Sequence, residues 1–167
     1  MRMKLVTIVA GVILSGVSTL AQSDAEKTFN TIKSLAGVWE GKNSMGDAVR
    51  VANRITAGGS ALVSEIQSDM KGRSEDMISM VHMDGNRLLL THYCAAGNQP
   101  RLVASTSPDG KTIIFDFLDA TNLANSDTGH MQRVIFTIRD ATHHSEDWYF
   151  RDHGKEIVEK FDLARKG

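Results

Sequence analysis

The feature that most constrains the fold is a regular alternation of short β-rich runs with turn-forming dipeptides. The turns are marked by Gly58-Gly59, Asp84-Gly85, Asp109-Gly110 and His153-Gly154, which supply the positive φ that tight hairpins need. The runs predict strands at 38–43, 47–56, 61–69, 75–83, 86–95, 101–107, 111–119, 130–139, 143–151 and 155–164. Strands joined mostly by hairpins must hide their edges, and closure does so most completely. We therefore predict an all-β fold, an antiparallel meander β-barrel of about ten strands.

A short helix is predicted ahead of the strands. Ser23 or Asp24 can cap its first turn, and the helix would run to about Leu35. Phe29, Ile32 and Leu35 recur at three-residue spacing, which gives the helix one apolar side. We expect this helix to cap one end of the barrel.

The segment that follows the helix, residues 37–41, reads Gly-Val-Trp-Glu-Gly. Gly37 ends the helix, and Trp39 is expected to plug the closed end of the barrel beneath it. The two glycines allow close backbone approach and a sharp bend.

The N-terminus has the pattern of a secretory signal peptide. Arg2 and Lys4 precede an uncharged apolar run at 5–20, and small residues favour cleavage after Ala21, or alternatively after Ala25. A retained membrane anchor fits less well, because the run is short and polar residues follow it at once. We therefore expect residues 1–21 to be removed and the protein to be exported, to the periplasm or outside the cell.

The remaining residues, 22–167, fit one domain with its own core. Removing Arg2 and Lys4 from the 19 basic residues leaves 17 against 20 acidic ones, a net charge of −3. This balance argues against nucleic acid or an anionic membrane as a partner. Cys94 is the only cysteine, so no internal disulfide can form and the core must hold the fold. The sequence indicates no oligomeric state.

Two predicted hairpins select the same set of inward-facing side chains. A two-residue turn at His153-Gly154 pairs Phe150 with Ile157, Trp148 with Glu159, Glu146 with Phe161 and His144 with Leu163. A three-residue loop at 140–142 brings Ile138 to His144, Phe136 to Glu146, Val134 to Trp148 and Gln132 to Phe150. The predicted interior is therefore apolar, with Glu146, Glu159, His144 and Gln132 as polar exceptions.

Glu146 is the most informative of these exceptions, because Phe136 and Phe161 are its expected neighbours. A carboxylate between two aromatic rings costs several kcal/mol unless it finds a partner or becomes neutral. Such a group could orient a ligand inside a cavity. The alternatives are that it pairs with an internal arginine or water, or that it lies near the barrel mouth.

A second candidate cluster is the stretch 90–101, which begins as a strand and ends in a polar loop. The Asp84-Gly85 turn places His92 on the face of Leu88, Leu90, Ser79 and Met77. Asn98, Gln99 and Arg101 could fold over the barrel end as a rim of hydrogen-bond donors. In the alternative interpretation these amides satisfy only their own loop.

No catalytic or metal site is assigned from the sequence. His143 and His144 point to opposite faces of a strand, so a metal bound with Glu146 would need ligands from other strands. His92, His130 and His144 are conceivable haem ligands, yet an inward histidine is more often simply hydrogen-bonded. No nucleophile elbow or phosphate-binding loop is present. The cofactor, if any, stays unknown.

The chain resembles known barrel families in particular stretches. The helix and residues 35–41 resemble the start of calycin-type barrels, the lipocalin, fatty-acid-binding and nitrobindin-like group. Residues 83–88 and 90–101 are similar to a family of small exported bacterial proteins of unknown function, and His130-Met131, Trp148 and residues 154–156 fit that likeness. The resemblance covers nearly all of 22–167 and implies a barrel and export, without an established activity. Nitrobindin-like proteins hold haem through a histidine near the chain end, and no position here matches that motif.

The leading functional hypothesis is a binding module. A barrel of about ten strands is wide enough to hold one modest, partly hydrophobic ligand in its lumen. The residues expected to line it are Phe115, Phe117, Phe136, Trp148, Phe150 and Phe161, with Glu146, His92, Gln132, Asn98, Gln99 and Arg101 as polar contacts. The first alternative is an enzyme that uses Glu146 as general acid or base with His92. The second is a filled barrel that serves as a scaffold or a partner-binding module.

Overall fold

The computed structural model describes residues 22–70 and 73–167. The expected signal peptide, residues 1–21, lies outside the described residues. No helix within the described ranges combines the length and the apolar character needed to cross a bilayer.

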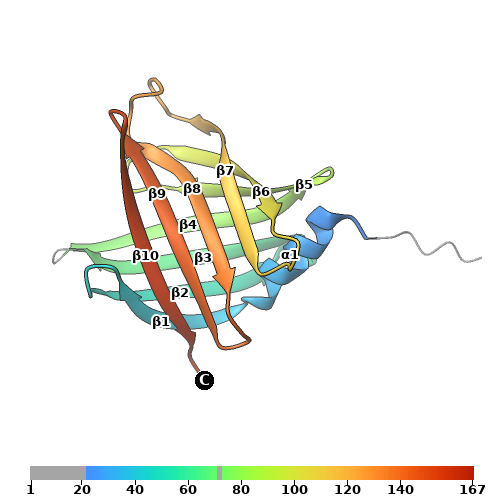
Figure 1. Cartoon of the computed structure of the whole chain (residues 1–167). Helices are drawn as coiled ribbons and strands as arrows, with labels where there is room; N and C mark the ends of the chain where they lie inside the picture. The colour runs from blue at the N-terminus through green and yellow to red at the C-terminus, as the bar shows by residue number, and fades with distance from the viewer. Residues whose placement is uncertain (1–21, 71–72) are drawn as a thin grey trace, which may run out of the picture.

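The described chain forms one α-helix followed by ten strands (Figure 1). The elements are α1 (Asp24–Ser34), β1 (Gly37–Asn43), β2 (Ala48–Thr56), a 3-10 turn (Ala57–Gly59), β3 (Ala61–Met70), β4 (Arg73–Asp84), β5 (Arg87–Tyr93), β6 (Gln99–Thr106), β7 (Thr112–Thr121), β8 (His130–Ile138), β9 (His143–Asp152) and β10 (Lys155–Arg165). Every strand predicted from the turn pattern is present, with bounds within two residues of the expected ones.

The strands close into an antiparallel barrel. Each strand pairs with its neighbours in sequence, and β1 pairs with β10 to complete the ring. Gly41 lies on this closing seam opposite Leu163. A Cβ at Gly41 would overlap the backbone carbonyl oxygen of Asp162, so the seam needs a glycine there. The predicted closed meander, and the close backbone approach at this glycine, are confirmed.

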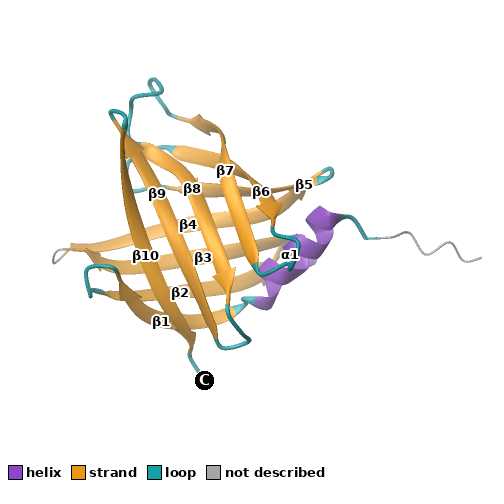
Figure 2. Cartoon of the chain, in the orientation of Figure 1, coloured by secondary structure: helices purple, strands orange, loops and turns teal. Residues whose placement is uncertain are grey.

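Helix α1 covers one end of the barrel, where it contacts β4, β5 and β6 (Figure 2). Ser23 caps it and forms a reciprocal capping box with Glu26. The apolar side, Phe29, Ile32 and Leu35, is buried. The helix therefore begins where the sequence predicts and turns the expected side toward the strands.

Trp39 is fully buried beneath α1, as predicted. Its indole N–H donates a 2.7 Å hydrogen bond to the carbonyl of Leu35, just past the end of the helix. The guanidinium of Arg165, at the end of β10, lies over the indole ring and donates to the carbonyls of Ser34 and Ala36. These contacts join the first and last elements of the fold at the helix end.

Successive turns of an antiparallel meander lie at alternate ends of the barrel. The β2–β3, β4–β5, β6–β7 and β8–β9 connections therefore share the end covered by α1. The β1–β2, β5–β6, β7–β8 and β9–β10 connections lie at the opposite end, which we call the open end.

The hairpin registers test the predicted inward set. All four predicted β9–β10 pairs are confirmed. Ser79 lies opposite His92, which confirms that the two residues share a face. On β8, Ile138, Phe136 and Val134 pair with β9 as predicted. The pairing of Gln132 with Phe150 was wrong. A register shift between Met131 and Arg133 places Met131 opposite Phe150, and Gln132 is left as the extra residue of a bulge.

Candidate functional site

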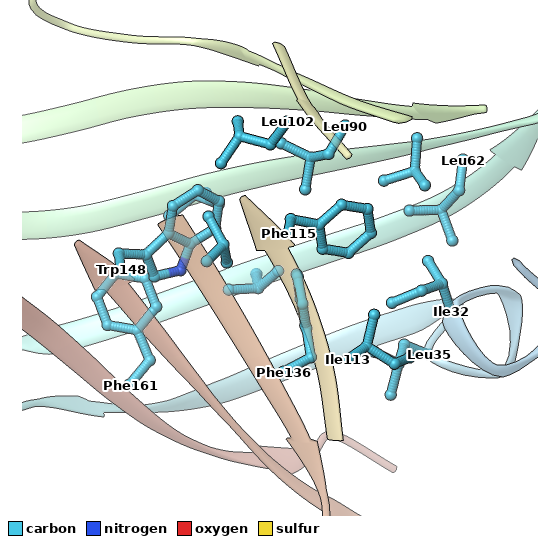
Figure 3. Close-up of a cluster of buried hydrophobic side chains, with 14 of the residues drawn as sticks. Ile32, Leu35, Leu62, Leu90, Leu102, Ile113, Phe115, Phe136, Trp148 and Phe161 are labelled. Carbon is cyan, nitrogen blue, oxygen red and sulfur yellow. The ribbon is translucent and has the colours of Figure 1, made fainter. Parts of the chain in front are cut away.

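The barrel interior is divided along its axis. Figure 3 shows Ile32 and Leu35 of the helix end at one side of the core and Trp148 and Phe161 at the other, with Phe115 and Phe136 between them. The side chains between helix and Trp148 are buried and in mutual contact. The helix half is therefore a packed core.

Beyond Trp148, toward the open end, lies a cavity of about 360 Å³. We call it the open-end pocket. Its aliphatic and thioether walls come from Ile66, Met77, Met131 and Ile157, and its aromatic walls from Trp148, Phe150 and Phe161. Residues 94–96 of the β5–β6 turn and Glu159 of β10 complete the lining. Because those turn residues and Ile157 stand at the ends of their strands, the pocket opens at the end opposite the helix.

Glu146 does not line this pocket. Only 1% of its surface is exposed, and both carboxylate oxygens have partners. Oε1 lies 3.0 Å from Nε2 of His144, and Oε2 accepts a 3.0 Å hydrogen bond from the indole N–H of Trp148. The predicted enclosure of Glu146 between Phe136 and Phe161 is confirmed. The carboxylate offsets its desolvation with a neighbouring imidazole and indole rather than with an internal arginine.

These three side chains belong together because of strand geometry. His144, Glu146 and Trp148 alternate along β9, so all three point into the barrel. The same spacing in the sequence could have identified His144 and Trp148 as the partners of Glu146. The hydrogen bonds from His144 to Glu146 and from Trp148 to Glu146 hold the indole of Trp148 from the side that faces away from the pocket.

His92 contacts the same tryptophan. It is fully buried, its Nδ1 lies 2.9 Å from Oγ of Ser79, and its ring centroid is 4.9 Å from that of Trp148. Burial lowers the pKa of His92 to about 4, so the ring is neutral at neutral pH. The sequence analysis paired His92 and Glu146 as candidates for acid–base catalysis. In the structure both contact Trp148, and neither lines the pocket.

The other aromatic and amide residues that were predicted to contact a ligand lie at different positions along the barrel axis. Phe115 and Phe136 pack edge to face in the helix half, with ring centroids 5.8 Å apart. Phe117 packs against the ring of His130, which also lies 3.2 Å from the side-chain oxygen of Gln132. Of the predicted contact residues, Trp148, Phe150 and Phe161 line the pocket.

The polar side chains of the 90–101 stretch hold their own loops together. Asn98 is buried and donates a 2.7 Å hydrogen bond to the carbonyl of Gly129. Gln99 accepts from the hydroxyl of Thr121. Arg101 is exposed and forms an ion pair with Asp119 on β7. Residues 94–96 of this stretch line the pocket, whereas Asn98, Gln99 and Arg101 do not.

Several lining residues were not singled out by the sequence. Met77 and Glu159 were placed on the inward face by their hairpin registers, but Ile66 and Met131 carried no signal beyond apolar character. Register shows which face a residue occupies. It does not show how far along the barrel axis the packed core extends, and that distance decides which inward residues meet a cavity.

Glu159 is a charged residue among the described residues that line the pocket, and Asn43 is hydrogen-bonded to it. The side-chain amide of Asn43 donates to Oε1 of Glu159 at 3.0 Å and to Oδ2 of Asp47 at 3.3 Å. Asn43 is itself 6% exposed, at the end of β1. Among the described residues, no cluster of three or more His, Cys, Asp or Glu side chains is placed to hold a metal ion. The arrangement is suited to holding a molecule with a large apolar surface and one polar group.

Comparison with known proteins identifies the fold. No family model matches the sequence, and no curated protein matches it significantly. Among solved structures, the crystal structure of Rv2717c from M. tuberculosis is similar, with a TM-score of 0.61 at 17% sequence identity. The alignment covers 86% of this chain and 100% of that one. At this identity the likeness shows a shared ten-stranded antiparallel barrel and nothing further about activity.

Proposed function

We propose that the barrel binds one small, largely apolar molecule in the open-end pocket. The observation that carries this proposal is the contrast between a packed helix half and an open half with a cavity of about 360 Å³. Small-molecule sites span roughly 300–1,000 Å³ and are mostly apolar with a few polar groups. The pocket matches that description at the small end of the range, which favours a ligand of modest size.

The rigidity of the inner wall supports the same proposal. Trp148 is held by Glu146 through its N–H, while His92, Phe136 and Phe161 contact its ring. A wall fixed before the ligand arrives loses little conformational freedom on binding. A barrel that served only as a filled scaffold would need no such wall facing a cavity.

Calorimetric titration tests the proposal. The protein would be titrated with 4-phenyl-1-butanol, dodecanoic acid and haem, and native mass spectrometry of the purified protein would detect any ligand carried along. Ala96→Phe, at the mouth of the pocket, should abolish or strongly weaken binding. Ala141→Phe, in the exposed turn between β8 and β9 at the helix end, is the matched control and should leave binding unchanged. Absence of binding by every probe, with no retained ligand, would refute the proposal.

We also propose that the protein is exported and belongs with the calycin-like barrels that residues 35–41 and 83–101 resemble. The support is the basic, apolar and small-residue succession over residues 1–21, together with a barrel closed by a front helix. Expression in a bacterial host followed by mass measurement of the extracellular or periplasmic protein tests this. A chain beginning at Gln22 is expected, and an uncut chain retained inside the cell would contradict it.

A further inference from the structure

Among the described residues, three aromatic rings line the open-end pocket. Trp148 and Phe150 occupy successive inward positions of β9, and Phe161 stands on the neighbouring strand β10. The ring centroids of Trp148 and Phe161 are 6.5 Å apart, with the ring planes inclined by 40°. A ligand in this cavity of about 360 Å³ therefore meets aromatic surface from two adjacent strands.

The ring of Phe150 occupies space that a glycine leaves open. Gly129 precedes β8, and its φ lies outside the left-handed region, so backbone conformation does not require a glycine there. A Cβ at this position would lie 2.8 Å from Cζ of Phe150 and 3.1 Å from a carboxylate oxygen of Asp152. The glycine therefore serves to make room for an aromatic ring that lines the pocket.

The rings of Trp148 and Phe150 are thus positioned before a ligand arrives. The indole N–H of Trp148 donates to Glu146, and the Phe150 ring packs against the backbone at Gly129. Aromatic pairs in offset or edge-to-face arrangements gain stabilisation beyond the area that they bury. Rings held in one arrangement offer that gain to a ligand without a further loss of side-chain freedom.

Thioether side chains of the lining favour the same kind of ligand. Met77 and Met131 line the pocket, and Met131 lies opposite Phe150 in the pairing of β8 with β9. A thioether sulfur makes favourable contacts with ring edges, and its flexible side chain adapts to the outline of a ring. A saturated ligand of the same size would bury similar area and gain neither the ring contacts nor the sulfur contacts.

From these observations we infer that the pocket selects an aromatic molecule, whose ring contacts Trp148 and Phe150, over a saturated molecule of the same size. This inference rests on the proposed function, because it names the chemical class of the ligand in the same site. It separates this barrel from one that accepts any apolar molecule according to buried area.

Two alcohols of matched size test the inference: 4-phenyl-1-butanol and 4-cyclohexyl-1-butanol. The saturated ring has at least as much apolar area, so a cavity without a ring preference should bind the cyclohexyl compound equally or more tightly. Calorimetric titration should instead show the phenyl compound binding about threefold to tenfold more tightly.

NMR of the protein labelled at its methionine methyl groups locates the bound ring. The phenyl compound should shift the methyl signals of Met77 and Met131 through its ring current, and the cyclohexyl compound should shift them much less. Met45, exposed in the β1–β2 turn, is the internal control and should not move. Unshifted Met77 and Met131 signals in the saturated phenyl complex would place the ring elsewhere and overturn the inference.

Phe150→Leu removes a ring and keeps an apolar side chain in the lining. It should lower the affinity for the phenyl compound about threefold to tenfold and change that for the cyclohexyl compound less than about twofold. Phe117→Leu, at a partly buried position of β7 outside the lining, is the matched control and should keep the preference. Gly129→Ala retains the Phe150 ring but displaces it, so it should also reduce the preference.

The outcomes distinguish the ring preference from the binding site itself. Equal affinities in the wild type, or an equal loss for both compounds in Phe150→Leu, would overturn the preference and leave a general apolar pocket. The wild-type comparison stands even if a variant does not fold. Failure of both compounds to bind would contradict the proposed function together with this inference.

Discussion

The two ends of this barrel are built from the same strands and differ in how they are filled. At the helix end, Phe29 and Ile32 of α1 and Leu35 just after it pack over the strands, and buried side chains occupy the lumen down to Trp148. At the open end no helix of the described residues covers the lumen, and residues 94–96 line a cavity there. A barrel of this strand number has more interior than its side chains need to fill, so the position of the one helix decides where the remaining space lies.

Several buried polar side chains lie around Trp148, at the boundary between the two halves. His144 is hydrogen-bonded to Glu146, which accepts from the indole N–H of Trp148, and Ser79 is hydrogen-bonded to His92, whose ring contacts Trp148. In an otherwise apolar core such groups are costly unless hydrogen-bonded. Their contacts with Trp148 indicate that they fix the inner wall of the pocket, whereas at the helix end the buried indole of Trp39 and the side chain of Asn53 donate hydrogen bonds to the backbone carbonyl of Leu35.

The largest expected difference between the halves is in how much the free energy of unfolding falls when an aromatic ring is removed. Phe115 is fully buried in the helix half, so Phe115→Ala should lower the free energy of unfolding by about 3–5 kcal/mol. Phe150 is partly buried and already borders the cavity, so Phe150→Ala should cost less than about 2 kcal/mol and weaken ligand binding instead. Urea unfolding measures both variants. Equal costs would show that the two halves are packed alike.

The next effect is on pH dependence and comes from His92 at the boundary. Burial lowers its pKa to about 4, whereas in the unfolded chain it titrates near 6.5. Between pH 4 and pH 6.5 the His92 ring is protonated in the unfolded chain and neutral in the folded protein. The stability contributed by the neutral ring is therefore complete above pH 6.5 and is lost as the pH falls toward 4, by roughly 3 kcal/mol in all.

Urea unfolding of the wild type and His92→Gln at pH 7 and pH 4 isolates this contribution. The wild type should lose roughly 3 kcal/mol more than the variant over that interval. His153→Gln removes an exposed histidine at the β9–β10 turn and should follow the wild type. Parallel pH profiles for wild type and His92→Gln would mean that His92 is protonated in the folded protein.

The sequence predicted the parts of this comparison that depend on local geometry. Two-residue turns fix register, so the inward placement of Glu146, Glu159 and His92 followed from Asp84-Gly85 and His153-Gly154. The helix bounds and the burial of Trp39 followed from capping and apolar spacing.

The parts that escaped prediction depend on features with no local signal. The bulge at Gln132 adds one residue to β8 without any change in composition. The register shift opposite Arg101 and Leu102 is of the same kind and leaves Leu118 of β7 as the extra residue. The depth of the packed core depends on how α1 seats against β4, β5 and β6, which are distant in sequence. For this reason the sequence selected Glu146 as a ligand contact, while the structure places Glu159 in the pocket and Glu146 behind its wall.

The smallest expected effect is that of changing Glu146 while keeping its hydrogen-bonding capacity. In Glu146→Gln, the amide oxygen can still accept from Trp148, and the amide nitrogen can donate to Nε2 of His144 once the histidine proton moves to Nδ1. That Nδ1 is buried and has no hydrogen-bond partner among the described residues, so the exchange should cost about 1 kcal/mol.

Glu146→Leu is the contrasting variant, because it leaves the Trp148 N–H without an acceptor. If Glu146 positions the wall of the pocket, the leucine variant should weaken 4-phenyl-1-butanol binding and alter the ligand-induced change in Trp148 fluorescence, whereas the glutamine variant should keep both near wild type. Trp39 lies under α1 and away from the pocket lining, so this ligand-dependent signal reports on Trp148. Unchanged binding in the leucine variant would assign Glu146 to stability alone, and the boundary between the two halves would then play no part in recognition.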